Sequence, residues 1–180
     1  MQTTLKYLRR KKVSCPPYFA IMHARHREAR YELAHQQIVG LLDNLADPVA
    51  AMACVAAVLF EQLPVASWVG FYRVVEADLL RIGPYQGPVG CIEIPFQQGV
   101  CGAAAREQQT QIVPDVRAFP GHIACDAHSR SEVVVPILDA EDRLVAVLDL
   151  DSHEPAAFDE TDATHLERIA ELLRPCFVSS

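Results

Sequence analysis

The chain has 180 residues, of which 51% are hydrophobic and 22% are charged, a composition typical of one globular domain and not of a disordered chain. Residues 1–30 contain eight basic residues and one acidic residue, a local charge of 8 − 1 = +7, so the formal net charge of −7 leaves −7 − 7 = −14 for residues 31–180. Phosphate backbones would repel this acidic body, which excludes nucleic acid as a partner of the domain, and no apolar run reaches the roughly 18 residues of a membrane-spanning helix.

Residues 1–27 are predicted to form a basic, disordered extension, with Met22 as an alternative start. The segment lacks the apolar region of a secretory signal, and Pro16-Pro17 interrupts any long helix. Contact with nucleic acid, an organellar presequence and a plain solvated extension all stay open for it. Residues 28–175 are predicted to form one domain, followed by a C-terminal tail at residues 176–180.

Apolar periodicity predicts four helices. They are Arg27–Leu45, Pro48–Leu63, Gly99–Gln109 and Asp159–Leu173. Asp47 can cap the second helix, and the proline after it suits a first helical turn, where no N–H is needed. Asp159 and Asp162 have the spacing of a capping box at the start of the last helix.

Runs of β-branched and alternating apolar residues predict six strands. They are Ser67–Val75, Leu79–Gly83, Cys91–Pro95, Gln111–Val113, Glu132–Leu138 and Leu144–Asp151. Short connections within the first and the last pair favour antiparallel hairpins. This order predicts an α+β fold with a central antiparallel sheet of about six strands and the N- and C-terminal helices packed on one side. The long loop Pro114–Arg130 has a length that usually indicates a functional segment.

Three cysteines, Cys91, Cys101 and Cys125, lie within 35 residues, each in a turn or loop setting rich in glycine. Glycine allows close backbone approach, which suits a thiol presented at a cavity. Because the thiols are far apart along the chain, they form one site only if the fold gathers them. A long, aliphatic-rich chain with six cysteines fits a reducing cytoplasmic compartment better than a disulfide framework. Free cysteines also pack as small hydrophobes, the role expected for Cys15, Cys54 and Cys176.

Several spaced motifs surround these cysteines. They are Trp68-Val69-Gly70-Phe71-Tyr72, Gly83-Pro84-Tyr85-Gln86-Gly87 followed by Cys91, Gly99-Val100-Cys101-Gly102, Gly121-His122-Ile123-Ala124-Cys125-Asp126, Ser131-Glu132 and Leu148-Asp149-Leu150-Asp151. Together they closely resemble the free methionine-(R)-sulfoxide reductases, enzymes with a GAF-domain fold, over roughly residues 28–173. One departure is a slightly longer hairpin loop around Arg143, which is distant from the motifs.

The resemblance implies a GAF-like catalytic domain that reduces the sulfoxide of free methionine through a cysteine sulfenic acid and an intramolecular disulfide. It implies Cys125 as the attacking thiolate, Cys91 as the resolving thiol and Cys101 as an auxiliary or second resolving thiol. Which of the last two pairs with Cys125 stays open. The positions that match the substrate pocket of the family are Trp68, Tyr72, Glu132, Asp149 and Asp151. Thioredoxin is the implied reductant, no cofactor or metal is implied, and a homodimer is compatible with the resemblance.

The carboxylates suit this chemistry for reasons independent of the family. A thiolate that attacks a sulfoxide sulfur needs an acid to protonate the oxygen. Burial and mutual repulsion raise the pKa of clustered carboxyl groups, so Glu132 and Asp149 are candidates for that acid, while the remaining carboxylates could hold the α-ammonium of a free amino acid. Asp149 and Asp151 lie on one face of their strand. As alternatives, Asp151 could only cap its strand, and Glu132 could pair with Arg130.

Other interpretations of the same residues stay open. Trp68 and Tyr72 face the same side of a strand, where they could contact a thioether or serve as ordinary core residues. A GAF domain could also be a non-catalytic sensor for a small ligand. A zinc site is a further alternative, although the chain lacks the closely spaced cysteine pairs usual for zinc. Its ligands would be Cys91, Cys101, His122, Cys125 and His128. Both histidines are otherwise expected to be exposed loop residues, although either could tune the pKa of Cys125.

Overall fold

The computed structural model describes residues 17–122 and 125–177, with side chains from residue 26 onward. The elements are α1 (Pro17–Leu42), α2 (Pro48–Gln62), β1 (Trp68–Glu76), β2 (Leu79–Gln86), β3 (Glu93–Pro95), α3 (Gly99–Glu107), β4 (Gln111–Val113), the 3₁₀ helix η1 (Val116–Ala118), β5 (Ser131–Leu138), β6 (Leu144–Ser152), α4 (Glu160–Leu173) and the 3₁₀ helix η2 (Arg174–Cys176). Within this described part, no helix is both long and apolar enough to cross a membrane.

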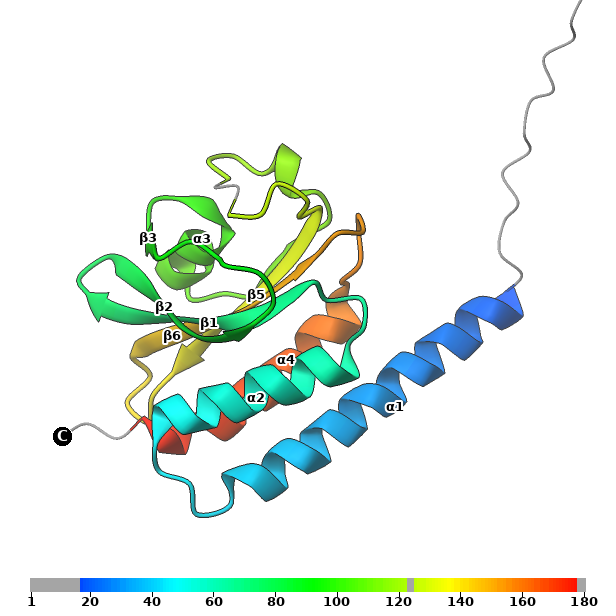
Figure 1. The fold of residues 1–180 in the computed structure, drawn as a ribbon, viewed down its shortest axis with the longest axis horizontal. Coiled ribbons are helices and arrows are strands. Elements are labelled where there is room, and N and C mark those ends of the chain that lie inside the picture. The colour runs from blue at the N-terminus through cyan, green and yellow to red at the C-terminus, as the bar shows by residue number, and fades with distance from the viewer. Residues whose placement is uncertain (1–16, 123–124, 178–180) are drawn as a thin grey trace, which may run out of the picture.

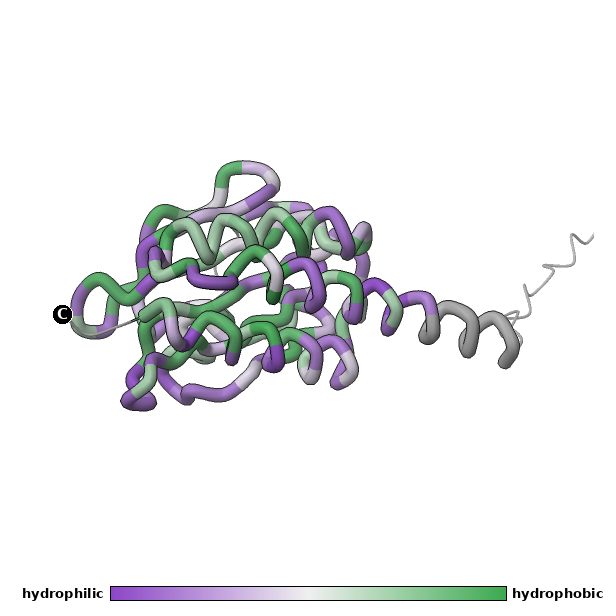
Figure 2. The backbone as a smooth tube through the Cα atoms, turned by 90° about the horizontal axis from the view of Figure 1, so that it is seen from below, coloured by the Kyte–Doolittle hydropathy of each residue, from purple (hydrophilic) through white to green (hydrophobic). Residues whose placement is uncertain are grey.

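The strands form one six-stranded antiparallel sheet in the order β3-β2-β1-β6-β5-β4. Helices α2 and α4 pack on one face of this sheet, α1 packs outside them, and α3 lies on the opposite face (Figure 1). The predicted α+β class, with an antiparallel sheet and the terminal helices on one side, is confirmed. In the helices, hydrophobic and hydrophilic residues alternate along the backbone (Figure 2), as expected for elements with one buried face.

Side chains of β1 alternate between two apolar clusters, one on each face of the sheet. Val69 and Phe71 belong to the larger cluster, which includes buried residues of α1, α2 and α4. Trp68 and Tyr72 belong to the smaller cluster on the α3 side. The same alternation places Leu148 and Leu150 of β6 among the helices. The polar residues on either side of Leu150, Asp149 and Asp151, therefore point toward the α3 side of the sheet.

Both predicted capping devices are confirmed. The Asp47 carboxylate accepts a hydrogen bond from the Ala50 N–H at 2.8 Å, and Pro48 opens α2. At the start of α4, Asp159 and Asp162 form a capping box. Asp162 is buried and also accepts a hydrogen bond from Tyr31 Oη at 3.0 Å. The Asp162 carboxylate therefore both caps α4 and connects α4 to α1.

Several predicted boundaries were wrong, among them the end of α1, which lies at Leu42 and not at Leu45. Helix α1 begins at Pro17 and not at Arg27, as proline suits a first helical turn. Strand β2 continues past Gly83 to Gln86, since Pro84 lies where the β1–β2 register shifts and no ladder hydrogen bond is needed from it. Strand β3 begins at Glu93, which leaves Cys91 in a loop. Residues 1–16 of the predicted extension lie outside the described residues, and the domain boundary at residue 28 stays a prediction.

Candidate active site

A small cavity of about 40 Å³ lies between the sheet and α3, with room for a few water molecules. All five predicted pocket residues line it, as do two of the three predicted catalytic cysteines. The lining residues used below are Trp68, Tyr72, Val89, Cys101, His122, Cys125, Asp126, Ser129, Glu132, Asp149 and Asp151. Residues that are far apart in the sequence therefore line one cavity. A reaction that uses separated cysteines requires such an arrangement.

One wall of the cavity is aromatic. The ring centroids of Trp68 and Tyr72 are 5.8 Å apart, and those of Trp68 and Tyr85 are 5.3 Å apart, with both pairs stacked. A Cβ atom on Gly70 would lie 2.3 Å from the Cβ of Tyr85 and 2.5 Å from the Trp68 ring. Glycine at position 70 is therefore what allows the two aromatic side chains to close over the strand. Tyr85 supports the wall without being among the predicted site residues.

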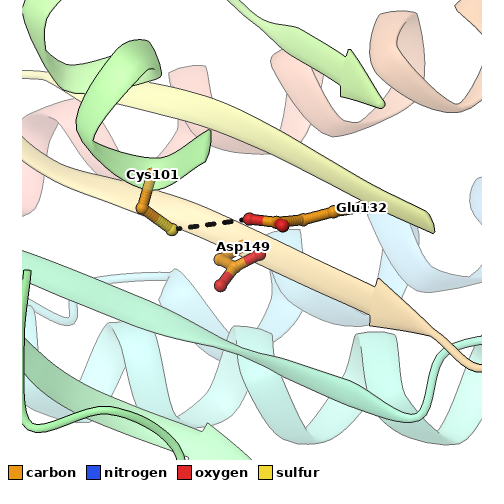
Figure 3. A group of neighbouring side chains, drawn as sticks. All are labelled: Cys101, Glu132 and Asp149. Atoms are coloured by element: carbon orange, nitrogen blue, oxygen red, sulfur yellow. Dashed lines mark hydrogen bonds between the residues drawn. The ribbon is translucent and has the colours of Figure 1, made fainter. Parts of the chain in front are cut away.

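Beside the aromatic wall, the neighbouring strands β6 and β5 are acidic. Glu132 on β5 lies directly across from Asp151 on β6, and Asp149 is paired with Val134. The exposed fraction is 6% for Glu132 and 5% for Asp149, so the surface alternative for Glu132 is wrong. Cys101 on α3 points toward both carboxyl groups (Figure 3), and its Sγ lies 3.9 Å from Glu132 Oε1. The Oδ1 atom of Asp149 is buried and has no hydrogen-bond partner. An unpaired buried oxygen is costly, so a ligand that donates a hydrogen bond to it would be favoured.

Burial and neighbouring charge raise the pKa of all three carboxyl groups. Burial raises the pKa of Glu132 well above its usual value, and the charges of Asp149 and Asp151 raise it further. Burial and the charge of Asp151 also raise the pKa of Asp149. Burial raises the pKa of Asp151 only to about 6, since Ser129 donates a hydrogen bond to it.

Two of the three predicted catalytic thiols are bonded to each other. Cys91, in the loop between β2 and β3, forms a disulfide with Cys125, and their Cα atoms are 5.2 Å apart. Cys101 is free and buried. Burial and the charges of Asp149 and Glu132 raise the pKa of the Cys101 thiol, so it stays protonated and is a poor nucleophile. The choice of partner for Cys125, which the sequence leaves open, falls on Cys91 in this structure.

This bond also removes support from the zinc alternative, because a disulfide sulfur is not a thiolate ligand. Among the described residues, one group of three potential ligands has its donor atoms within 4.8 Å, and it consists of Cys101, Glu132 and Asp149. Of the five residues proposed as zinc ligands, only Cys101 belongs to this group.

The Cys125 loop is tied to the end of β6 by polar contacts. The Asp126 carboxylate lies 2.9 Å from His153 Nε2 and 3.1 Å from His128 Nδ1, and Ser129 donates its hydroxyl to Asp151. His128 is exposed, as expected. His122 instead lines the cavity and is half-buried, which lowers its pKa. Ser129 and His153 are not among the predicted site residues, although both lie within two residues of a motif.

Gly102 follows Cys101 on α3, and its close contact with the backbone allows a test of how α3 packs. An added Cβ would lie 2.7 Å from the backbone oxygens of Pro95 and Phe96. Gly102→Ala is expected to lower the free energy of unfolding by about 1–3 kcal/mol through overpacking. Gly40→Ala is the matched control, because nothing lies within 4 Å of its added Cβ, and it should stabilise α1 by about 0.5–1 kcal/mol. Urea unfolding of both variants measures these changes, and equal midpoints would contradict the packing.

Comparison with known proteins agrees with this geometry. Residues 48–175 match the GAF domain family. The free methionine-R-sulfoxide reductase of Escherichia coli is 41% identical over 124 residues, which cover 69% of this chain and 74% of that protein. The structure of free methionine-R-sulfoxide reductase from Neisseria meningitidis in complex with its substrate has 45% identity and a TM-score of 0.78, covering 82% of this chain and 87% of that one. The reduced form of fRMsr of Staphylococcus aureus has 41% identity and a TM-score of 0.77, covering 81% and 94%.

The fold and the matching residues define this chain as a GAF-domain protein. GAF domains alone include binding modules as well as enzymes, so the residues of the site decide the subgroup. The chain belongs to the free methionine-R-sulfoxide reductase family.

Proposed function

We propose that the protein reduces free L-methionine-(R)-sulfoxide to methionine, with Cys125 as nucleophile, Cys91 as resolving thiol and a dithiol protein such as thioredoxin as reductant. The observation that carries this proposal is the position of Cys125, which lines a cavity with buried carboxyl groups and is within bonding distance of a second thiol. A binding module would need the cavity but no such pair of thiols.

The proposed reaction has two steps. The Cys125 thiolate attacks the sulfoxide sulfur, Glu132 delivers a proton to the oxygen, and the oxygen is transferred to leave methionine and the sulfenic acid of Cys125. Cys91 then attacks the Cys125 sulfur, water leaves, and the Cys91–Cys125 bond forms. Each cycle oxidises two thiols to a disulfide and reduces one sulfoxide. The reductant must therefore supply two electrons per methionine.

Charge explains why the substrate would be a free amino acid. Asp151, with a pKa of about 6, is ionised near neutral pH, and its carboxylate can bind an α-ammonium group that a residue within a peptide lacks. The unpaired Asp149 Oδ1 offers a second acceptor. The rings of Trp68 and Tyr72 suit the methyl thioether, since sulfur and aromatic rings attract each other. Cys101, held as a neutral thiol, contributes a weak hydrogen-bond donor beside Glu132.

A thioredoxin-coupled assay tests the proposal. The protein should consume reductant and form methionine with the R epimer of the free sulfoxide, with much less turnover of the S epimer or of a peptide that contains methionine sulfoxide. Tight binding of the R epimer without any methionine formed would instead support the sensor alternative.

The pKa of Asp151 predicts a dependence of substrate binding on pH. As the pH falls through about 6, Asp151 gains a proton and loses the charge that would hold the ammonium group. KM for the free sulfoxide should then rise about tenfold between about pH 7 and pH 5. Steady-state kinetics across this range measure the effect. In Asp151→Asn, KM should be high at all these pH values, and a KM that still rose tenfold at low pH would assign the titration to another group.

A further inference from the structure

The two sulfurs of the disulfide face different surroundings. Cys125 lines the cavity, whereas Cys91 is not among its lining residues. Cys91 is half-buried and lies between two apolar side chains, Val89 and Ile92. Their exposed fractions, 76% and 60%, are the largest among the exposed large hydrophobic residues of the described part of the chain. Exposed apolar side chains beside a reactive group indicate a surface that another molecule covers.

The loop that contains Cys91 is the more open approach to the disulfide for a large partner. Thiol–disulfide exchange requires the attacking sulfur to contact the sulfur that it reduces. Cys91 and Cys125 are both half-buried. Cys125 faces the narrow cavity that the substrate would occupy, which leaves less room for a folded protein than the exposed loop around Cys91 does.

We propose that the loop from Val89 to Ile92 is the docking surface for a protein dithiol, which attacks the sulfur of Cys91 and not that of Cys125. This inference rests on the function proposed above. In the first step the reductant thiolate bonds to Cys91 Sγ, the Cys91–Cys125 bond breaks, and its electron pair leaves on Cys125 as a thiolate inside the cavity. The second thiol of the reductant then attacks the mixed disulfide, Cys91 leaves as a thiolate, and the reductant departs as a disulfide.

The charge around the loop favours an apolar contact. Residues 87–92 carry no ionisable group other than Cys91. The next acid, Glu93, is paired with Arg81 at 2.8 Å, so its charge is compensated within the protein. The loop is also anchored to the aromatic wall, because Trp68 Nε1 donates a hydrogen bond to the Pro88 carbonyl at 3.0 Å. An anchored apolar surface beside a disulfide suits a folded protein reductant better than a small hydrophilic thiol, which needs no such surface.

A trapping experiment tests the site of attack without requiring turnover. The disulfide form is mixed with thioredoxin whose second active-site cysteine is replaced by serine, quenched with acid and alkylated, and the linked peptides are mapped by mass spectrometry. The expected product links thioredoxin to Cys91 and carries an alkylated Cys125. A link to Cys125, or no link, overturns the inference. Failure of the proposed function would appear separately, as an absence of methionine formation with every reductant.

A substitution in the loop tests the docking surface. Ile92→Glu is chosen because Ile92 does not line the cavity, and Val49→Glu on α2 is the matched control with 50% exposure. Burying the new charge in an apolar contact should lower the ratio of thioredoxin-driven to dithiothreitol-driven turnover about tenfold. The same ratio should be unchanged in Val49→Glu. An unchanged ratio in Ile92→Glu, or an equal fall in Val49→Glu, overturns the docking surface.

Discussion

Cys125→Ser is expected to lower turnover of the free R-sulfoxide by about a thousandfold or more, because a serine hydroxyl is not ionised near neutral pH and cannot replace a thiolate nucleophile. The measurement is methionine released per enzyme in the thioredoxin-coupled assay. Cys54→Ser is the matched control, since Cys54 is a free, half-buried cysteine on α2, away from the cavity. Turnover that survives in Cys125→Ser would remove Cys125 from the nucleophile role.

Replacing Cys91 or Cys101 by serine should have different effects on methionine formation and on the disulfide. In Cys91→Ser, one methionine per enzyme should form with dithiol protein as reductant before turnover slows, because the sulfenic acid of Cys125 then lacks the thiol to which Cys125 is bonded in this structure. In Cys101→Ser, the Cys91–Cys125 bond should still form, since Cys101 is not part of it. A full loss of the single turnover in Cys91→Ser would contradict the assigned order of steps.

Glu132→Gln should lower kcat by about 10²–10⁴-fold, the usual contribution of a general acid. Glu132 is buried beside Asp149, and burial and the charge of Asp149 keep its pKa raised and its proton in place. The amide has nearly the same shape but cannot deliver a proton to the sulfoxide oxygen. Single-turnover kinetics with the R epimer measure the step directly. Asp149→Asn is the matched comparison, and a larger loss in that variant would assign the acid to Asp149.

Glu132→Gln should also change how the free energy of unfolding depends on pH. A group with a raised pKa in the folded state stabilises the fold at low pH, and this contribution is lost as the pH rises through the folded pKa. The free energy of unfolding of the unsubstituted protein should therefore decline toward alkaline pH. In Glu132→Gln the decline should be smaller, so the variant is expected to be more stable at about pH 8 while being less active. Urea unfolding at several pH values would show whether the two curves differ.

Much of the fold follows from local sequence. The capping residues Asp47 and Asp159 predict two helix starts correctly, because a cap involves only atoms within one turn. Alternation along β1 and β6 predicts correctly that Trp68 and Tyr72 share a face, and that Asp149 and Asp151 do. The end of β2 was predicted wrongly at Gly83, because the register shift that accommodates Pro84 depends on the partner strand β1.

What the sequence by itself determined was the inventory of groups and the face of each element on which they lie, since these depend on covalent order and on the period of strand or helix. Only the tertiary structure decided that Cys125 bonds to Cys91 while Cys101 stays free, and that burial raises the pKa of Glu132 and Asp149. Distances between thiols and the solvation of carboxyl groups arise from the β5–β6 register and from the loops packed over it. Those are contacts between residues remote along the chain, and no local pattern encodes their separation.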